Sequence, residues 1–310
     1  MDVTLALGGG GSRGYAHVGI IRRLEQEGFR ICAVAGSSAG GIIAAFYAAG
    51  FTPDEMEVQF SKVDQTKLFG RSPGDGPALL GVAGASKWLN EQFGERTFAD
   101  LKTPCALTAV DIKSAREIVL DQGRLVDAVL ATIALPGILP PQPIQNYQLV
   151  DGGVLDPVPV SVARSLAPRL PVVAVILTPL VGHTGSLTRF SLPFPILKPI
   201  VQRITRFRVA QAFEVFLHSV DAAGRLLTEL RLQVDDPEIA IRPAVGHIGL
   251  LDKVDVHEVI RLGEEAVDAA LPEIKRSLAW PNRLRRRWFT PALRGFTPAV
   301  RGLNPRQEVK

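Results

Sequence analysis

The sequence predicts an α/β protein built on a mainly parallel central sheet with helices on its faces. Three apolar runs, at residues 3–7, 31–35 and 172–177, have the length and composition of buried strands. A helical stretch follows each of the first two runs, and this alternation is typical of parallel sheets. Glycine-rich segments stand at the ends of these two strands, where open parallel sheets place their ligands.

Residues that favour helix ends mark the first helices. The helices predicted over 15–26 and 39–49 are each closed by a glycine within two residues. Thr52 and Pro53 then provide an N-cap and a first-turn proline for a helix that runs towards residue 63. The remaining expectations are a Gly/Pro-rich loop at 70–84, strands at 104–111, 116–121, 147–150 and 239–241, an irregular segment at 178–199, and helices at 125–135, 200–229 and 256–278.

Length and composition predict one large domain followed by a tail. A chain of 310 residues that is 46% hydrophobic and 21% charged can bury one large core. We expect this domain over residues 1–278 and the tail over 279–310. Cys32 and Cys105 lie in apolar runs, which predicts buried free thiols and a reducing, cytoplasmic location. The N-terminal residues resemble neither an export signal nor a membrane span, so any membrane contact is expected to be peripheral, at the inner face.

The charge of the chain is divided between an acidic body and a basic tail. Residues 275–310 contain ten Lys and Arg and one acidic residue, a net charge of +9, whereas residues 1–274 carry −5. Trp280 and Trp288 stand among the arginines, and apolar side chains suit the headgroup region of an anionic membrane better than a nucleic acid. We therefore expect membrane contact and no nucleic-acid partner. A solvated tail, broken by its prolines, is the alternative.

Residues 8–14 form a glycine-rich segment between a strand and a helix. Its spacing satisfies the G-x-G-x-x-G pattern of dinucleotide sites, but the next strand ends in small residues instead of the acidic residue that holds a ribose. The glycine-rich segment also lacks the Gly-Lys-Ser/Thr sequence of a phosphate-binding loop. Consecutive glycines at a helix N-terminus leave main-chain N–H groups open, which suits a developing oxyanion.

The segment 36–40 reads Gly-Ser-Ser-Ala-Gly and follows an apolar strand-like run. This G-x-S-x-G pattern, between a strand and an Ala-rich helix, is typical of a serine nucleophile on a strained turn. We therefore predict that Ser38 is a nucleophile for acyl transfer. The N–H of Ala39 and those of Gly10 and Gly11 are predicted to face the same oxyanion.

A serine nucleophile requires a base, and the residues leave two candidates. His247 lies in a loop after the acidic candidate, which matches the serine, acid, histidine order of α/β-hydrolases. Those enzymes place the serine after several strands, however, whereas Ser38 follows the second. Asp151 stands on a Gly-Gly turn, from which its carboxylate can approach the serine directly, provided that burial raises its proton affinity.

These motifs, taken in order, resemble those of bacterial patatin-like phospholipases. The similarity rests on the glycine loop ending in Arg13, the segment 36–40, the Leu-Pro-Gly-Ile-Leu-Pro-Pro run at 135–141, and the Asp-Gly-Gly that begins at Asp151. It covers residues 1–177 well, the later helices more loosely and the tail not at all. Gly8 departs from plant relatives, which have an acidic residue there.

The resemblance implies a three-layer fold, hydrolysis of lipid acyl esters with release of free fatty acids, and no metal or organic cofactor. It also implies a Ser-Asp dyad without histidine. The residues expected to form the site are Ser38 and Asp151 as nucleophile and base, Gly9, Gly10, Gly11 and Ala39 around the oxyanion, and Arg13, Gly36, Gly40, Gly152 and Gly153 in support.

Two other functions remain open from the sequence. One is a Ser-His-Asp esterase for soluble esters, and the other is a non-catalytic protein that binds a lipid or a nucleotide. The segment 189–208 combines an apolar loop with a basic amphipathic helix, which fits a lid, a membrane foot or an ordinary surface helix. The sequence makes no prediction of an oligomeric state.

Overall fold

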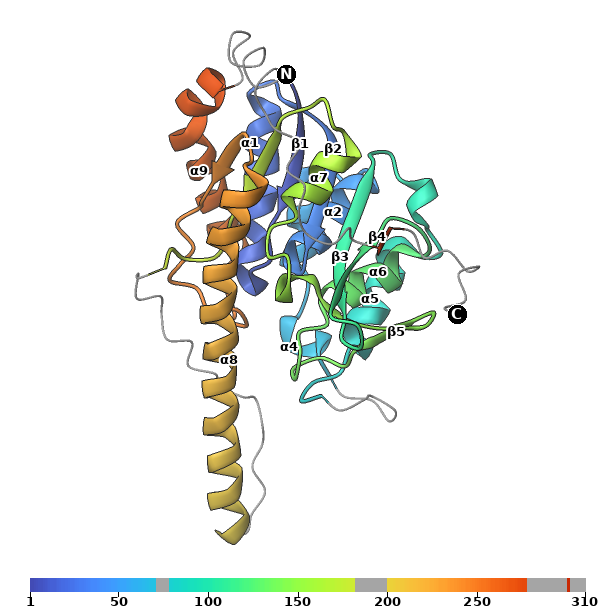
Figure 1. Ribbon diagram of the computed structural model, residues 1–310, viewed down its shortest axis with the longest axis vertical. Helices are drawn as coiled ribbons and strands as arrows, with labels where there is room; N and C mark the ends of the chain where they lie inside the picture. Colours follow the sequence, from blue (N-terminus) through green and yellow to red (C-terminus); the bar gives the residue numbers. More distant parts are fainter. Residues whose placement is uncertain (71–77, 182–199, 278–299, 302–310) are drawn as a thin grey trace.

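A computed structural model of the protein describes residues 1–70, 78–181, 200–277 and 300–301 (Figure 1). Within these residues, nine strands form one sheet, in the order β5-β6-β3-β2-β1-β7-β8, while β4 pairs with β3 and β9 with β4. The strands are β1 Asp2–Leu7, β2 Arg30–Ser37, β3 Cys105–Asp111, β4 Arg116–Leu120, β5 Gln142–Ile144, β6 Tyr147–Asp151, β7 Val172–Val175, β8 Ile239–Ile241 and β9 Val300–Arg301. Most pairs are parallel, as predicted; the pairs β3–β4, β3–β6 and β5–β6 are antiparallel.

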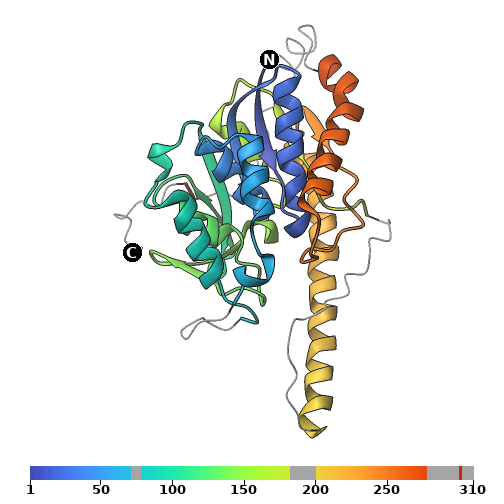
Figure 2. The same ribbon diagram turned by 180° about the vertical axis from the view of Figure 1, so that it is seen from behind.

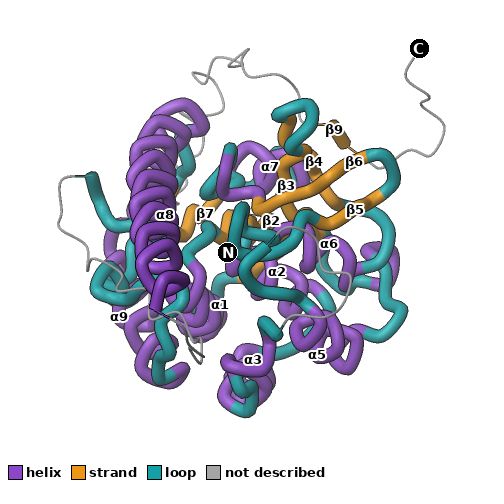
Figure 3. Tube along the Cα trace, turned by 90° about the horizontal axis from the view of Figure 1, so that it is seen from below, coloured by secondary structure: helices purple, strands orange, loops and turns teal. Residues whose placement is uncertain are grey.

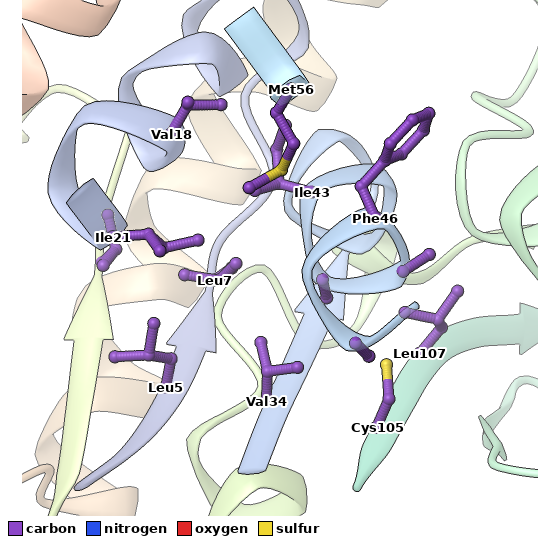
Figure 4. Packing of buried hydrophobic residues seen from close by; sticks show 14 of the residues in the cluster. Leu5, Leu7, Val18, Ile21, Val34, Ile43, Phe46, Met56, Cys105 and Leu107 are labelled. Carbon is purple, nitrogen blue, oxygen red and sulfur yellow. The ribbon is translucent and has the colours of Figure 1, made fainter. Parts of the chain in front are cut away.

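Helices cover both faces of the sheet and give the expected three layers (Figure 3). They are α1 Ala16–Gln26, α2 Ala39–Ala48, α3 Pro53–Ser61, α4 Gln65–Leu68, α5 Ala83–Phe93, α6 Leu125–Thr132, α7 Val160–Leu166, α8 Ile200–Asp235 and α9 Val256–Ser277, with 3-10 turns at Gly11–Tyr15, Phe98–Asp100 and Gly152–Val154. Alternation along the strands separates two cores: Leu5 and Leu7 of β1 pack with α1 and α2, whereas Ala6 packs with α7. Part of the larger core is shown in Figure 4.

Ring packing in the larger core explains a helix that the sequence did not predict. Ala85, Leu89 and Phe93 of α5 recur every four residues and are buried. Phe93 and Trp88 of α5 lie 4.7 and 5.3 Å from the ring of Phe46 on α2. These contacts stabilise α5, which begins inside the predicted 70–84 loop.

Other expectations are corrected or extended by the structure. Cys105 is buried, but Cys32 is only half-buried, because it lies near the start of β2; both are free thiols. Strand β7 ends at Val175 and helix α6 at Thr132, earlier than predicted, whereas α8 continues to Asp235. Figures 1 and 2 show α8 extending well beyond the body of the molecule.

Two segments of the sequence analysis fall largely outside the described residues. They are the loop of the segment 189–208, up to residue 199, and the tail apart from β9, which pairs with β4 at the edge of the sheet. Among the helices that the structure describes, none has both the length and the hydropathy to cross a bilayer.

Candidate active site

Ser38 lies on a sharp turn between β2 and α2. Its backbone has φ 54°, in the left-handed region that non-glycine residues rarely adopt. The turn requires glycine on both sides. A Cβ on Gly36 would lie 2.4 Å from the carbonyl oxygen of Gly40, and a Cβ on Gly40 would lie 2.2 Å from that of Leu7. The G-x-S-x-G pattern therefore follows from a close approach of three main-chain segments.

The side chains of Ser38 and Asp151 are hydrogen bonded to each other. Ser38 Oγ donates to Asp151 Oδ2 at 2.5 Å, and the N–H of Gly153 donates to Asp151 Oδ1 at 2.8 Å. Both carboxylate oxygens thus have a donor, and the Asp151 residue is only 3% exposed. The structure thereby brings together the serine and the acid that the sequence analysis singled out.

Sheet topology explains why these two residues meet. β4 lies along one edge of β3 over residues 107–111, so β2 and β6 both lie along the other edge. β2 is parallel to β3 and ends with Ser37 opposite Thr108, whereas β6 is antiparallel and ends with Asp151 opposite Ala109. Because Thr108 and Ala109 are adjacent, the two strands meet end to end, and the residues at their carboxyl ends face each other.

Burial changes the acid–base properties of Asp151. Desolvation raises the pKa of its carboxyl to about 6, although the hydrogen bonds from Ser38 and Gly153 oppose this rise. A carboxylate with this pKa is mostly ionised at neutral pH, yet it accepts a proton more readily than an exposed aspartate. Its environment therefore suits a general base.

The glycine loop lies beside Ser38, and only some of its N–H groups are hydrogen bonded to the rest of the fold. The N–H groups of Gly8 and Gly9 donate to the carbonyl oxygens of Val175 and Pro157 at 3.0 and 2.9 Å. Within the described residues, those of Gly10, Gly11 and Ala39 donate to no loop or turn carbonyl. Gly9 contributes to the wall of the site rather than as a donor: a Cβ on Gly9 would lie 3.1 Å from Ser38 Cβ.

Side-chain hydrogen bonds from Arg13 and Ser12 hold this loop in place. Arg13 is 2% exposed, and its Nε donates to the carbonyl oxygen of Ile248 at 2.6 Å. Desolvation lowers the pKa of its guanidinium, opposed by Asp221 and Asp252. Ser12 Oγ donates to the carbonyl oxygen of Asp252 at 2.7 Å. The loop is therefore anchored to the segment 248–252, which is remote in the sequence.

Among the residues that the structure describes, no histidine takes part in the contact between Ser38 and Asp151. His17 is fully buried, and desolvation lowers its pKa to about 4, so the ring is neutral at pH 7. Its Nε2 lies 2.8 Å from the carbonyl oxygen of Gly8 and donates to it, which orients the glycine loop. His247 is exposed and makes no hydrogen bond within the described part of the chain.

A buried ion pair holds the loop that follows Asp151. Asp156 is fully buried, and its Oδ2 lies 2.9 Å from Nη2 of Arg231 on α8. Desolvation and the nearby Glu117 carboxylate raise the pKa of Asp156 well above its ordinary value. The next residue is Pro157, whose carbonyl oxygen accepts the N–H of Gly9. Asp156 was not singled out by the sequence, although it follows the Asp-Gly-Gly motif by three residues.

Sequence reasoning also missed the contribution of α6. Thr132 Oγ1 accepts the N–H of Ser38 at 2.9 Å, and the carbonyl oxygen of Ala134 accepts the N–H of Asp151 at 3.0 Å. The available signal was a lone hydroxyl in the otherwise apolar run 128–135. Among the described residues, no cluster of His, Cys, Asp and Glu has the arrangement of a metal site.

The pKa of Asp151 leads to a prediction about stability. The carboxyl has a pKa of about 6 in the folded protein and about 4 when unfolded, so folding favours its protonated form. The buried carboxyl therefore lowers the free energy of unfolding as the pH rises. This effect is absent below pH 4, grows between pH 4 and 6, and is complete above pH 6. Asp151→Asn is therefore expected to raise the free energy of unfolding by roughly 2–3 kcal/mol at pH 8 and by much less at pH 4.

Urea unfolding of wild type and variant at both pH values measures this difference. The exposed Asp236→Asn serves as a matched control and is expected to show little pH-dependent change. An Asp151→Asn effect of equal size at pH 4 and pH 8 would show that the carboxyl is not perturbed by burial.

Comparison with known proteins places this arrangement in a family. The family model for patatin-like phospholipases matches residues 5–164. An uncharacterised NTE family protein of Mycobacterium tuberculosis is 35% identical over 162 residues, which cover 51% of this chain and 44% of the relative. Human patatin-like phospholipase domain-containing protein 6 is 29% identical over 174 residues, 54% of this chain and 13% of the relative. The chain thus spans less than half the length of these relatives.

The fold has a counterpart among solved structures. VipD from Legionella pneumophila superimposes with a TM-score of 0.55 over 87% of this chain and 67% of that chain, at 14% sequence identity, which shows a shared fold. The family match covers β1 to α7, and therefore the glycine loop, the Ser38 turn and the Asp151 turn. The chain belongs to the patatin-like phospholipase family.

Proposed function

We propose that the protein is a serine lipid acyl hydrolase that uses Ser38 as nucleophile and Asp151 as general base. The observation that carries this proposal is the 2.5 Å hydrogen bond from Ser38 Oγ to the buried carboxylate of Asp151. The lipid substrate class is supported by the family match and by the names of the relatives. We also propose that residues 1–278 form the catalytic domain.

In the proposed mechanism, Ser38 Oγ attacks the carbonyl carbon of a lipid ester while its proton passes to Asp151 Oδ2. The negative charge on the substrate oxygen is stabilised by the N–H groups of Gly10, Gly11 and Ala39. The tetrahedral intermediate then expels the alcohol, which takes the proton from Asp151. Water, deprotonated by Asp151, attacks the acyl-serine and releases the fatty acid, and the proton returns to Ser38 Oγ.

Removing either member of the Ser38–Asp151 pair is expected to abolish most turnover. Ser38→Ala and Asp151→Asn should each lower kcat/KM for an acyl ester by about a thousandfold or more, and the double variant should be scarcely worse, because the two residues act as a unit. Ser37→Ala, in the same motif, and His247→Ala serve as controls and should retain most activity. Activity is measured on a panel of lipid esters, and circular dichroism shows whether each variant is folded.

A fluorophosphonate label provides a second readout of the same prediction. Mass spectrometry should locate the adduct on Ser38, and Asp151→Asn should react much more slowly. An adduct on another residue would refute the assignment of the nucleophile. Loss of activity in a folded His247→Ala variant would instead support the Ser-His-Asp alternative.

The pKa of Asp151 predicts the pH dependence of the reaction. Because the base must be ionised, kcat/KM in the wild type should fall as the pH falls through about 6, the pKa of the Asp151 carboxyl. An ordinary histidine titrates in the same range, so the profile should be repeated with His247→Ala. The midpoint of the pH profile of kcat/KM should be the same in His247→Ala as in the wild type. If His247→Ala no longer lost activity as the pH fell, the role of Asp151 would be contradicted.

We further propose that the basic tail contacts anionic membrane surfaces. The +9 net charge of residues 275–310 and the tryptophans among their arginines support this proposal. Changing Arg283, Arg285, Arg286 and Arg287 to Gln should weaken binding to anionic vesicles by about 1 kcal/mol per residue, but should not affect zwitterionic vesicles or hydrolysis of a soluble ester. Vesicle co-sedimentation at two salt concentrations tests this; wild-type binding that is insensitive to salt would contradict it.

A further inference from the structure

The C-terminal end of α6 contacts the main chain of both residues of the Ser38–Asp151 pair. Thr132 is fully buried; its Oγ1 accepts the N–H of Ser38 at 2.9 Å and donates to the carbonyl oxygen of Thr108 at 2.6 Å. Two residues later, the carbonyl oxygen of Ala134 accepts the N–H of Asp151 at 3.0 Å. One short segment therefore holds both turns.

The Thr132 hydroxyl also links these turns to β3. Its acceptor, the carbonyl oxygen of Thr108, lies at the point where β2 and β6 meet, and a Cβ on Gly152 would lie 2.4 Å from this oxygen. The hydroxyl thus connects the amide of Ser38 to the residue of β3 that packs against the turn after Asp151. Both of its hydrogen-bonding functions are used.

The amide of Ser38 needs such a contact because its backbone is strained. A residue at φ 54° stays there only where its surroundings determine the conformation. The hydrogen bond to Thr132 fixes the peptide plane between Ser37 and Ser38, and this plane sets the direction of Ser38 Oγ. The N–H of the following residue, Ala39, is left to face the substrate oxygen.

We propose that Thr132 is a positioning residue for Ser38, a role that rests on the proposed function. Its hydroxyl holds the Ser38 amide, so that Oγ points at the same time towards Asp151 and towards the carbonyl carbon of the substrate. Thr132 does not contact the reacting atoms in this arrangement; it acts through Ser38.

Two substitutions separate the hydroxyl of Thr132 from its methyl group. A Cβ on Gly41 would lie 2.7 Å from Thr132 Cγ2, so the methyl packs closely against the first turn of α2. Thr132→Val keeps this packing and removes the hydroxyl, whereas Thr132→Ser keeps the hydroxyl and removes the methyl. Thr4→Val is the matched control, since Thr4 is equally buried in β1 and its hydroxyl has no partner among the described residues.

The test compares the full-length wild type with the three variants on a short soluble ester and a fluorophosphonate. Thr132→Val is expected to lower kcat/KM and the labelling rate together by about 10- to 100-fold, with KM within about twofold, because a small misplacement of the nucleophile has this effect. Thr132→Ser should stay within about threefold of the wild type, and so should Thr4→Val.

Amide hydrogen exchange at Ser38, measured by NMR, tests the contact independently of catalysis. Thr132→Val should accelerate this exchange by at least about tenfold, whereas Thr132→Ser and Thr4→Val should not. Wild-type activity in Thr132→Val would overturn the positioning role and leave the proposed function intact. An inactive wild type would contradict the proposed function alone, and the exchange rates would still decide whether Thr132 holds the Ser38 amide.

Discussion

The site depends on one topological constraint, the meeting of β2 and β6 along a single edge of β3. One strand is parallel to β3 and the other antiparallel, so their carboxyl ends converge on Thr108 and Ala109. Because main chains crowd at this point, the residue after Asp151 must be small: a Cβ on Gly152 would lie 2.4 Å from the carbonyl oxygen of Thr108. Gly152 is therefore a consequence of this convergence, whereas Gly40 follows from the close approach of β1 to the Ser38 turn and Gly36 from its own close approach to Gly40.

The polar groups around the convergence orient main-chain amides. His17 donates a hydrogen bond to the carbonyl oxygen of Gly8. The carbonyl oxygen of Pro157 accepts the N–H of Gly9, and Thr132 Oγ1 accepts the N–H of Ser38. Each contact ties one main-chain group into the fold. These contacts come from four separate segments of the chain, which are brought together only in the folded protein. Within the described residues, the N–H groups of Gly10, Gly11 and Ala39 donate to no loop or turn carbonyl.

The same arrangement carries two energetic costs. Ser38 adopts a backbone conformation that is unfavourable by about 1–3 kcal/mol, and the Asp151 carboxylate is ionised in a buried position that raises its pKa. The large core between the sheet, α1, α2 and α5 offsets these costs, and the ion pair between Asp156 and Arg231 adds a link from α8 to the loop after Asp151. Strain and buried charge of this kind are concentrated where a reaction needs preorganised groups.

Local sequence determined the features that depend on near neighbours in the chain. Apolar runs predicted the strands, closing glycines predicted the ends of α1 and α2, and the glycine, serine and aspartate motifs predicted the fold and family that the comparisons confirm. The motif around Ser38 also implied its strained turn, because the small residues beside it serve only a close approach of main chains.

Tertiary structure decided what depends on residues far apart in the chain. The sequence could not show that β6 would run antiparallel to β3, and this direction is what places Asp151 rather than His247 against Ser38. It could not show the pKa of Asp151, since desolvation depends on every segment packed around the carboxyl. Nor could it mark Thr132, because a hydroxyl becomes a partner for the Ser38 amide only when the end of α6 is packed against that turn.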